Sequence, residues 1–216
     1  MTMPFRTFFS SFARLLGGAI FGAAVLALTV SSLYAAEDLS KEMILNDPAA
    51  PVAGNPAGDV TIVAFLDYNC PFCKKAAPDL ERAVKQDGRV RLVYKDWPIL
   101  SEASKYGARA ALAAKYQGKY QEVHNALLAV PGRKITEDQM REAISKSAVD
   151  LTRMERDMKA HAAEIDTVLD RNLAQADGLG LQGTPVFLIG SFMVPSVLSY
   201  EEFQKVIAEA RLKVAK

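Results

Sequence analysis

The distribution of apolar and polar positions predicts a strand-rich start to the folded chain. Residues 60–66 (VTIVAFL) form a short β-branched run bounded by polar residues, as expected for a buried, parallel strand. Residues 74–86 are predicted to be helical, with one apolar face made of Ala76, Ala77, Leu80, Ala83 and Val84. A second strand is predicted at 90–94. Strand, helix and strand in close succession predict a βαβ unit with a right-handed crossover.

Helical periodicity replaces the strand pattern between residues 101 and 176. The Ala-rich stretch at 101–120 has strong helix propensity, and the helical pattern that follows it stops at Pro131. Thr136 followed by Gln139 forms the sequence pattern of a capping box, which opens another helix. About 75 residues of helix without a strand signal predict a compact helical subdomain.

The strand pattern returns near the C-terminus. Residues 185–189 (PVFLI) predict a strand, and a turn at Gly190 leads to a second short strand at 192–194. Ser199 with Glu202 caps a last helix. The inward face of that helix carries Phe203, Val206, Ile207 and Ala210. The predicted order is therefore βαβ, a helical block, then ββα.

The first 36 residues differ from the rest of the chain. They contain no Lys, Asp or Glu, and the apolar run 15–30 follows two arginines and precedes small residues. This pattern is typical of a secretory signal peptide, with cleavage expected after Ala35 or Ala36. An uncleaved membrane anchor at 15–36 is the alternative, since its length is suitable for a bilayer. Either alternative exports the remainder of the chain.

Residues 37–59 form a lead-in without a strong period. Its DPAAPVAGNPAGD stretch is rich in Pro, Gly and Ala, which predicts extended chain and turns. The folded domain is expected to begin at residue 60 and to end near residue 213.

Composition and charge narrow the classes of function. The chain has 216 residues, half of them apolar, which is enough for one substantial core. The chain has 26 basic and 25 acidic residues. Without the two arginines of the first segment, 24 basic and 25 acidic residues remain, which gives a formal charge of about −1. Neither a nucleic-acid groove nor a patch for anionic membranes is indicated.

The chain has two cysteines, Cys70 and Cys73, in the sequence CPFC. Exported proteins meet an oxidising environment, in which neighbouring thiols tend to pair. A disulfide between residues three positions apart closes a very small loop and removes little entropy from the unfolded chain. A purely structural disulfide is therefore a weak explanation for this pair.

The position of the pair favours a reactive dithiol. Cys70 follows the strand, and Pro71 is suited to the first turn of the next helix. Cys70 therefore faces unpaired backbone N–H groups at the positive end of a helix dipole, which favours a thiolate. Cys73 lies about one turn later and is expected to be more buried. We expect Cys70 to exchange with substrates and Cys73 to resolve the mixed disulfide.

Two metal-binding alternatives use the same thiols. Zinc needs about four ligands, and only His124 and His161, on helical segments of the middle block, could join the cysteines. Each histidine is better explained as a surface or satisfied core residue. A Cu(I) carrier with two thiolate ligands remains open, because soft thiolates suit that ion. Covalent haem attachment requires His after the second cysteine, where Lys74 stands.

Several motifs together resemble the DsbA-like thioredoxin-fold oxidoreductases, in particular the exported branch with DsbA-type oxidases and ScsC-like proteins. The similarity covers residue 60 to the C-terminus and rests on FLDYNCPFCKKAAPDL, VRLVYKDWPIL, KYQGKYQEVHNALL and GLQGTPVFLIG. The resemblance implies an α/β thioredoxin fold (βαβ…ββα) over 60–213, with a helical insertion at about 101–177. It implies no metal and no organic cofactor.

The resemblance also assigns roles to residues near the dithiol. Thr184 and Pro185 correspond to the cis-proline loop, whose backbone pairs with a substrate peptide as a short added strand. Pro71 and Phe72, between the cysteines, are expected to tune the site, and Lys95 is expected to bias it electrostatically. Related proteins carry a buried acid six residues before the first cysteine, where this chain has Ala64.

The resemblance implies a periplasmic disulfide oxidase that acts on reduced or misfolded exported proteins through a mixed disulfide at Cys70. A DsbB-like membrane partner would reoxidise it. A reductase or isomerase recharged by a DsbD- or ScsB-like partner is the alternative, because Thr184 stands where isomerase and ScsC-like members often have Thr. The lead-in is too short for the helical stalk of ScsC-like trimers, which predicts a monomer.

Overall fold

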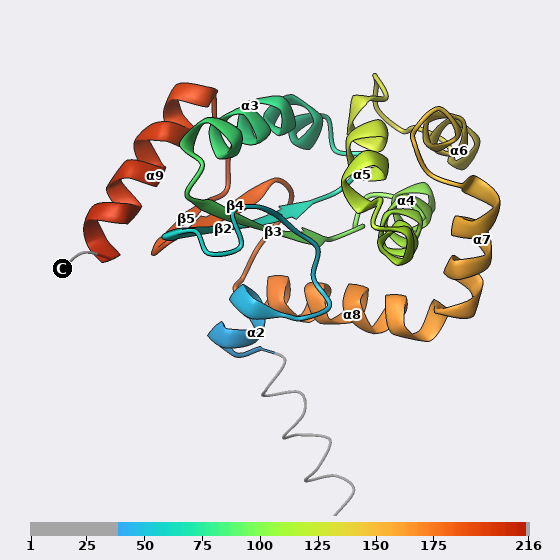
Figure 1. The fold of residues 1–216 in the computed structure, drawn as a ribbon, viewed down its shortest axis with the longest axis horizontal. Coiled ribbons are helices and arrows are strands. Elements are labelled where there is room, and N and C mark those ends of the chain that lie inside the picture. Colours follow the sequence, from blue (N-terminus) through green and yellow to red (C-terminus); the bar gives the residue numbers. More distant parts are fainter. Residues whose placement is uncertain (1–38, 215–216) are drawn as a thin grey trace, which may run out of the picture.

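The computed structural model describes residues 39–214, and the predicted signal peptide lies outside this range. One mixed sheet forms the centre of the fold, with helices on both of its faces and a group of helices at one end (Figure 1). The strands are β1 (Val52–Gly54), β2 (Val60–Leu66), β3 (Val90–Asp96), β4 (Val186–Ile189) and β5 (Phe192–Val194). The helices are α2 (Lys41–Asn46), α3 (Pro71–Asp87), α4 (Glu102–Ala114), α5 (Tyr120–Ala129), α6 (Glu137–Ser145), α7 (Leu151–Ala160), α8 (Ala162–Gly178) and α9 (Tyr200–Val214), with a 3₁₀ turn η1 (Lys115–Gln117).

The strands follow the order β1-β3-β2-β4-β5. β2 and β3 are parallel, and their register runs from Val60 opposite Val90 to Leu66 opposite Asp96. β4 pairs antiparallel with β2, and β5 forms a hairpin with β4. Both central strands are almost fully buried, which explains their continuous apolar runs. The structure confirms the predicted βαβ and ββα units.

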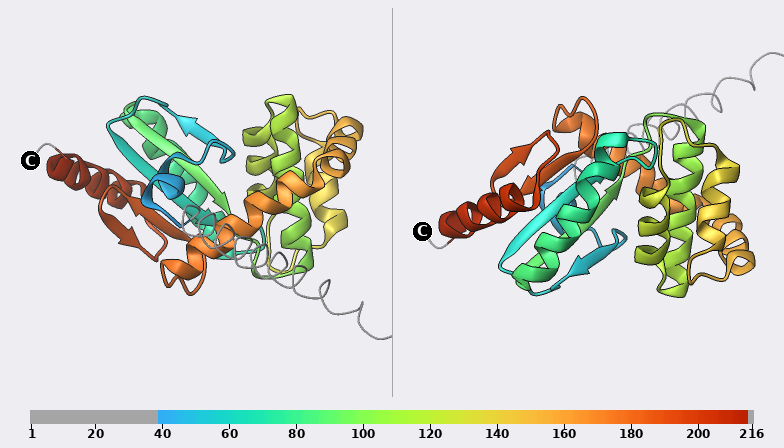
Figure 2. Two further views of the ribbon diagram at one scale, coloured as in Figure 1. Left: turned by 90° about the horizontal axis from the view of Figure 1, so that it is seen from below. Right: turned by 90° about the horizontal axis from the view of Figure 1, so that it is seen from above.

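Each face of the sheet has its own cluster of buried residues. α3 and α9 pack on the first face, and its cluster includes Ala64, Leu66 and Tyr94. α2 and part of α8 pack on the second face, where Val63 and Val93 are buried. Figure 2 shows α8 returning from the helical group to the sheet, so this helix joins the two parts of the fold. No helix between residues 39 and 214 has the length and apolar character needed to cross a membrane.

The helices α4 to α7 form the predicted helical subdomain. Their interior is apolar, with Val123, Leu127, Met140, Ile144 and Met154 fully buried. Thr136 and Gln139 form the predicted capping box at the start of α6, with both reciprocal hydrogen bonds present. The Ser199–Glu202 cap of the last helix is also confirmed.

The lead-in is more regular than its sequence predicts. Ser40 caps the short helix α2, and β1 pairs antiparallel with β3 as an edge strand. Residues 47–59 are extended chain and turns, as predicted, whereas the sequence predicts no helix at 41–46 and no paired strand at 52–54. Both elements are too short for a clear period, and contacts with the sheet hold them in place.

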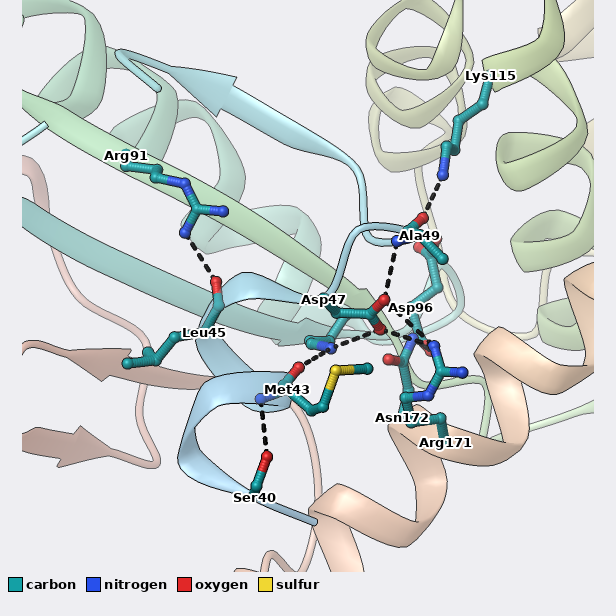
Figure 3. A network of polar contacts seen from close by, with 11 residues as sticks. Ser40, Met43, Leu45, Asp47, Ala49, Arg91, Asp96, Lys115, Arg171 and Asn172 are labelled. Carbon is teal, nitrogen blue, oxygen red and sulfur yellow. Dashed lines mark hydrogen bonds and ion pairs between the residues drawn. The ribbon is translucent and has the colours of Figure 1, made fainter. Parts of the chain in front are cut away.

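A buried polar network fastens this N-terminal segment to the sheet (Figure 3). Asp47, just after α2, accepts hydrogen bonds from Lys95 Nζ at 3.3 Å, Arg171 Nη1 at 3.1 Å and the Ala49 amide at 2.8 Å. Lys95 Nζ also approaches the Met43 carbonyl at 3.4 Å. Burial raises the pKa of Asp47, but the Lys95 charge, the Ala49 amide and Arg171 outweigh it and hold the pKa below its ordinary value.

Candidate active site

Cys70 is the N-cap residue of α3, as the sequence predicts. Its backbone is extended, with φ −79° and ψ 116°, and Pro71 occupies the first helical position. The Cys73 amide donates a hydrogen bond to Cys70 Sγ at 3.4 Å. The Cys70 sulfur therefore takes the place of the side-chain oxygen that usually caps a helix.

The two thiols differ strongly in acidity. A hydrogen bond from the Cys73 thiol lowers the pKa of Cys70 most, and burial opposes this effect. The Thr184 side chain and the amides of Cys73 and Phe72 lower the pKa of Cys70 further, to about 6. Burial raises the pKa of Cys73 far above its ordinary value, and the neighbouring Cys70 raises it further. At neutral pH the reduced pair is therefore a Cys70 thiolate beside a Cys73 thiol.

Thr184 and Pro185 lie next to the cysteines in the structure, although they are more than 100 positions away in the sequence. Their peptide bond is cis, in agreement with the resemblance. The Thr184 carbonyl accepts a hydrogen bond from the protonated Cys70 thiol, at an Sγ–O distance of 3.2 Å. The Thr184 hydroxyl is buried beside the two sulfurs, and its hydrogen bonding lowers the pKa of both thiols. The loop thus places a backbone acceptor and a buried hydroxyl beside the dithiol.

Asp67 organises the turn that delivers Cys70. The residue is buried, and its carboxylate accepts hydrogen bonds from the Asn69 amide at 2.7 Å and the Ser104 hydroxyl at 2.7 Å. Its other oxygen accepts from the amides of Ile99 and Leu100, at 2.9 Å and 3.0 Å. Asp67 is therefore a positioning residue that joins the β2–α3 turn to the segment after β3.

Asn69 ties the same turn to the helical subdomain. Its amide nitrogen donates to Ser101 Oγ at 2.8 Å and to the Ile135 carbonyl at 3.1 Å. Its oxygen accepts from the Ile135 amide at 2.6 Å. Apolar periodicity does not predict this role. An Asn directly before a helix-starting Cys-Pro pair is its only local signal.

A buried polar cluster lies behind the turn. Asp96 accepts hydrogen bonds from Tyr68 at 2.8 Å and from Tyr120 at 3.1 Å, and Tyr68 also contacts His124 Nδ1 at 2.9 Å. Burial raises the pKa of Asp96 to about 7, although both phenols lower it. Burial lowers the pKa of His124 to about 3, so this residue is a neutral, satisfied core histidine.

The second histidine, His161, lies far from the cysteines and does not complete a metal site with them. His161 stacks on Tyr116, with ring centroids 3.8 Å apart, and lies away from the cysteines in another helix junction. Over the range that the structure describes, His, Cys, Asp and Glu form no group of three or more that could hold a metal ion.

Lys95 and Ala64 lie on opposite faces of the sheet. Ala64 is fully buried in the same cluster as Cys73, on the face covered by α3. Side chains alternate along a strand, so Lys95 points with Val93 toward the other face, where it pairs with Asp47. The structure thus brings Cys70, Cys73, Pro71, Phe72, Thr184 and Pro185 together but not Lys95. Its tuning role stays a prediction.

A groove of about 740 Å³ passes the cis-proline loop. Phe72, Thr184, Pro185 and Met193 contribute to its wall. Phe72 is 56% exposed, whereas Cys70 is 3% exposed and Cys73 is fully buried. Cys70 is therefore the thiol nearer to a polypeptide in this groove, which agrees with the expectation that Cys73 is the more buried partner.

Comparisons with known proteins give a consistent assignment. A thioredoxin family model matches residues 46–209. The Na(+)/H(+) antiporter NhaA 3 of Salinispora tropica is 30% identical over 176 residues, which cover 73% of this chain and 24% of that protein. The chain thus spans about a quarter of the length of this relative. The probable disulfide bond formation protein D of Bacillus cereus is 25% identical over 195 residues, covering 82% of this chain and 89% of that protein.

Solved structures agree with this result. A thioredoxin-like oxidoreductase from Silicibacter pomeroyi DSS-3 is 40% identical, with a TM-score of 0.75 and coverage of 80% of this chain and 98% of that chain. The thiol-disulfide exchange protein alpha-DsbA2 from Wolbachia pipientis is 25% identical, with a TM-score of 0.73 and coverage of 83% and 97%. The catalytic domain of Proteus mirabilis ScsC is 25% identical, with a TM-score of 0.71 and coverage of 83% and 98%. The chain belongs to the thioredoxin family, in its DsbA-like group of thiol:disulfide oxidoreductases.

Proposed function

We propose that this protein is a periplasmic disulfide oxidase that introduces disulfides into exported proteins. The observation that carries the proposal is the difference in acidity between the two thiols. The pKa of Cys70 is lowered to about 6, whereas that of Cys73 is raised far above its ordinary value. A stabilised Cys70 thiolate favours the reduced form, and a dithiol with a stable reduced form has an oxidising disulfide.

The reaction begins with the protein in its disulfide form. A substrate thiolate attacks Cys70 Sγ, the Cys70–Cys73 bond breaks, and Cys73 leaves and takes up a proton. A second substrate thiolate then attacks the substrate sulfur of the mixed disulfide, and Cys70 leaves as a thiolate. The substrate loses two electrons and two protons and gains a disulfide. The low pKa of Cys70 favours the second step, because a more acidic thiol is a better leaving group.

Substrate binding is assigned to the cis-proline groove. An extended polypeptide can pair with backbone groups near Thr184 as a short added strand, which fixes its position without reading its sequence. The exposed Phe72 ring gives this groove an apolar wall beside Cys70. Such recognition suits many unfolded substrates.

A reductase or isomerase is the second candidate. Thr184 supports it, because its side chain hydrogen-bonds to the sulfurs and lowers the pKa of both thiols, so that it influences both redox states of the pair. The same residues would then act in the opposite direction, and a DsbD- or ScsB-like membrane partner would keep the dithiol reduced. The oxidase would instead need a DsbB-like partner.

The reduction potential distinguishes these directions. We expect a value near −120 mV for an oxidase, whereas one near −200 mV or lower would support the reductase. Cys70→Ser should abolish exchange, and Cys73→Ser should trap mixed disulfides with substrates. Stoichiometric copper in the purified reduced protein without oxidation of a reduced substrate would instead support a Cu(I) carrier.

The proposal extends to the organisation of the chain. Residues 1–36 would direct export, residues 60–213 would form the catalytic domain, and the helices at about 101–177 would be an inserted subdomain. The protein would act as a monomer. Gel filtration of the exported form and mass determination of its N-terminus test these points directly.

A further inference from the structure

A second groove begins at Pro71, the residue directly after Cys70, and none of the residues of the cis-proline loop lines it. It has a volume of about 570 Å³ and lies between α3 and α5 with the connection that follows α5. Figure 1 shows α3 and α5 side by side, and the two helices are in contact. We call this feature the α3–α5 groove. Its walls include Pro71, Lys74, Lys75, Leu128, Gly132 and Arg133.

The two grooves meet at the start of α3. Pro71 lines the α3–α5 groove, and the next residue, Phe72, lines the cis-proline groove. Lys75 lines both. Cys70 directly precedes these residues, so a polypeptide that reacts at Cys70 has one groove on each side of its cysteine.

The α3–α5 groove carries a local excess of positive charge. Lys74, Lys75 and Arg133 line it, and none of them forms an ion pair with an acid in residues 39–214. Lys74 Nζ donates to the Gly132 carbonyl at 3.2 Å, which holds its charge at the wall. Glu81, the one acid among the described residues that line the groove, lies seven positions after Lys74 on α3.

This charge is not a general property of the protein. The whole chain has 26 basic and 25 acidic residues. Some exposed cations elsewhere lie in ion pairs, such as Arg109 with Asp166 and Lys146 with Glu142. Three cations that line one groove at the start of α3 without an acidic partner can pair with acidic groups of a binding partner.

We propose that the α3–α5 groove binds an acidic segment of the substrate polypeptide next to its reacting cysteine. This inference rests on the proposed oxidase function and adds a substrate class to it. Carboxylates of the substrate pair with Lys74, Lys75 and Arg133, while the cis-proline groove holds the chain on the other side of the cysteine. The protein thus prefers substrates with Asp or Glu close to a cysteine.

The length of the α3–α5 groove determines how far the acidic residues of the substrate should lie from its reacting cysteine. Pro71 and Glu81 are ten residues apart on α3, which corresponds to about 15 Å at 1.5 Å per residue. An extended substrate covers about 3.3 Å per residue, so roughly four to five of its residues span the groove. The carboxylates should therefore lie about two to four residues from the cysteine, because Glu81 repels them at the far end.

The experiment compares three reduced dithiol peptides of equal length as substrates of the oxidised exported protein. Beside one cysteine they carry Glu, Gln or Lys residues at this spacing. The rate constant for reduction of the Cys70–Cys73 disulfide is followed by protein fluorescence. We expect the Glu peptide to react about tenfold faster than the Gln peptide, as two or three exposed ion pairs would provide. At about 1 M salt, where screening acts over about 3 Å, this ratio should approach one.

Charge-reversal variants locate the effect. The double variant Lys75→Glu with Arg133→Glu should reverse the preference, so that the Lys peptide reacts fastest. The matched control, Lys146→Glu with Lys159→Glu, changes net charge equally on remote helices and should retain the preference. Equal rates for the three peptides, or the same loss in both double variants, would overturn the inference.

A small uncharged dithiol separates this inference from the proposed function. If the protein oxidises dithiothreitol rapidly but does not distinguish the peptides, the substrate preference is wrong and the oxidase proposal survives. If dithiothreitol is also not oxidised, the oxidase proposal itself fails. Dividing each peptide rate by the dithiothreitol rate removes any effect of the variants on the Cys70 pKa.

Discussion

The contribution of the Cys73 thiol to the acidity of Cys70 leads to a sharp prediction. The hydrogen bond from this thiol is the largest single cause of the lowered Cys70 pKa. Cys73→Ala removes the donor, whereas Cys73→Ser replaces S–H by O–H and keeps a donor at the same position. Both variants retain the Cys73 backbone N–H, which approaches Cys70 Sγ at 3.4 Å.

The expected size of the effect follows from hydrogen-bond energetics. A hydrogen bond to a charged acceptor contributes about 1.5–3 kcal/mol, and one pKa unit corresponds to about 1.36 kcal/mol. Removing the donor should therefore raise the pKa of Cys70 from about 6 by roughly one to two units, while the Ser variant stays near the starting value. At pH 7 the thiolate fraction would fall from roughly nine-tenths to between about a half and a tenth.

The ultraviolet absorbance of the thiolate, recorded against pH, measures this shift directly. Alkylation by iodoacetamide provides a second readout, which changes less than the thiolate fraction because nucleophilicity falls with pKa. Equal pKa values in the two variants would refute the reasoning. The backbone amides at the start of α3 would then account for the acidity without the Cys73 thiol.

Three further predictions concern stability. The pKa of Cys70 is lowered in the folded state, so the reduced protein should gain stability relative to the oxidised protein as pH rises from about 6 to 9. This added stability should be lost as pH falls through 6. Urea unfolding of both forms at several pH values measures the difference. Asp47→Ala removes the buried Asp47 carboxylate that pairs with Lys95 and should cost about 3–5 kcal/mol. Asp166→Ala, at an exposed pair, should cost less than about 1 kcal/mol in the same assay. Asn69→Ala removes the hydrogen bonds between the β2–α3 turn and the helical subdomain, and it should lower the free energy of unfolding by about 1–3 kcal/mol. The reaction of the dithiol with peptides should also become slower. Unchanged kinetics would show that this contact does not position Cys70.

The sequence predicts those features that depend on neighbouring residues. The β-branched run at 60–66 identifies β2, and the order Asn69-Cys70-Pro71 identifies the N-cap and the first turn of α3. Periodicity alone does not show that the turn is held by Ile135, which lies 66 positions after Asn69. The same limit applies to α2 and β1, which are stabilised by contacts with the sheet and not by a pattern of their own.

The buried polar residues show this limit most clearly. Tyr68, Asp96, Tyr120 and His124 belong to three different segments, with Tyr120 and His124 both on α5, and each is unremarkable in its own sequence context. Lys95 and Asp96 are adjacent, yet the alternation of β3 sends them to opposite faces, one toward Asp47 and the other toward Tyr68. The sequence identifies charged residues near the end of a strand but cannot say which of them belongs to the active-site face.

The position of the acids bears on the direction of the reaction. A charged carboxylate close to Cys70 would oppose the thiolate and make the disulfide less oxidising. Position 64 on β2 carries Ala. On the neighbouring strand β3, the nearest acid on the same face is Asp96, which accepts hydrogen bonds from the phenols of Tyr68 and Tyr120. Burial raises the pKa of Asp96 to about 7. Asp96 is therefore only about half ionised at neutral pH, and its remaining charge is directed toward Tyr68 and Tyr120. Positions 64 and 96 on this face of the sheet therefore offer little opposition to the Cys70 thiolate, and the groups at the start of α3 dominate its acidity.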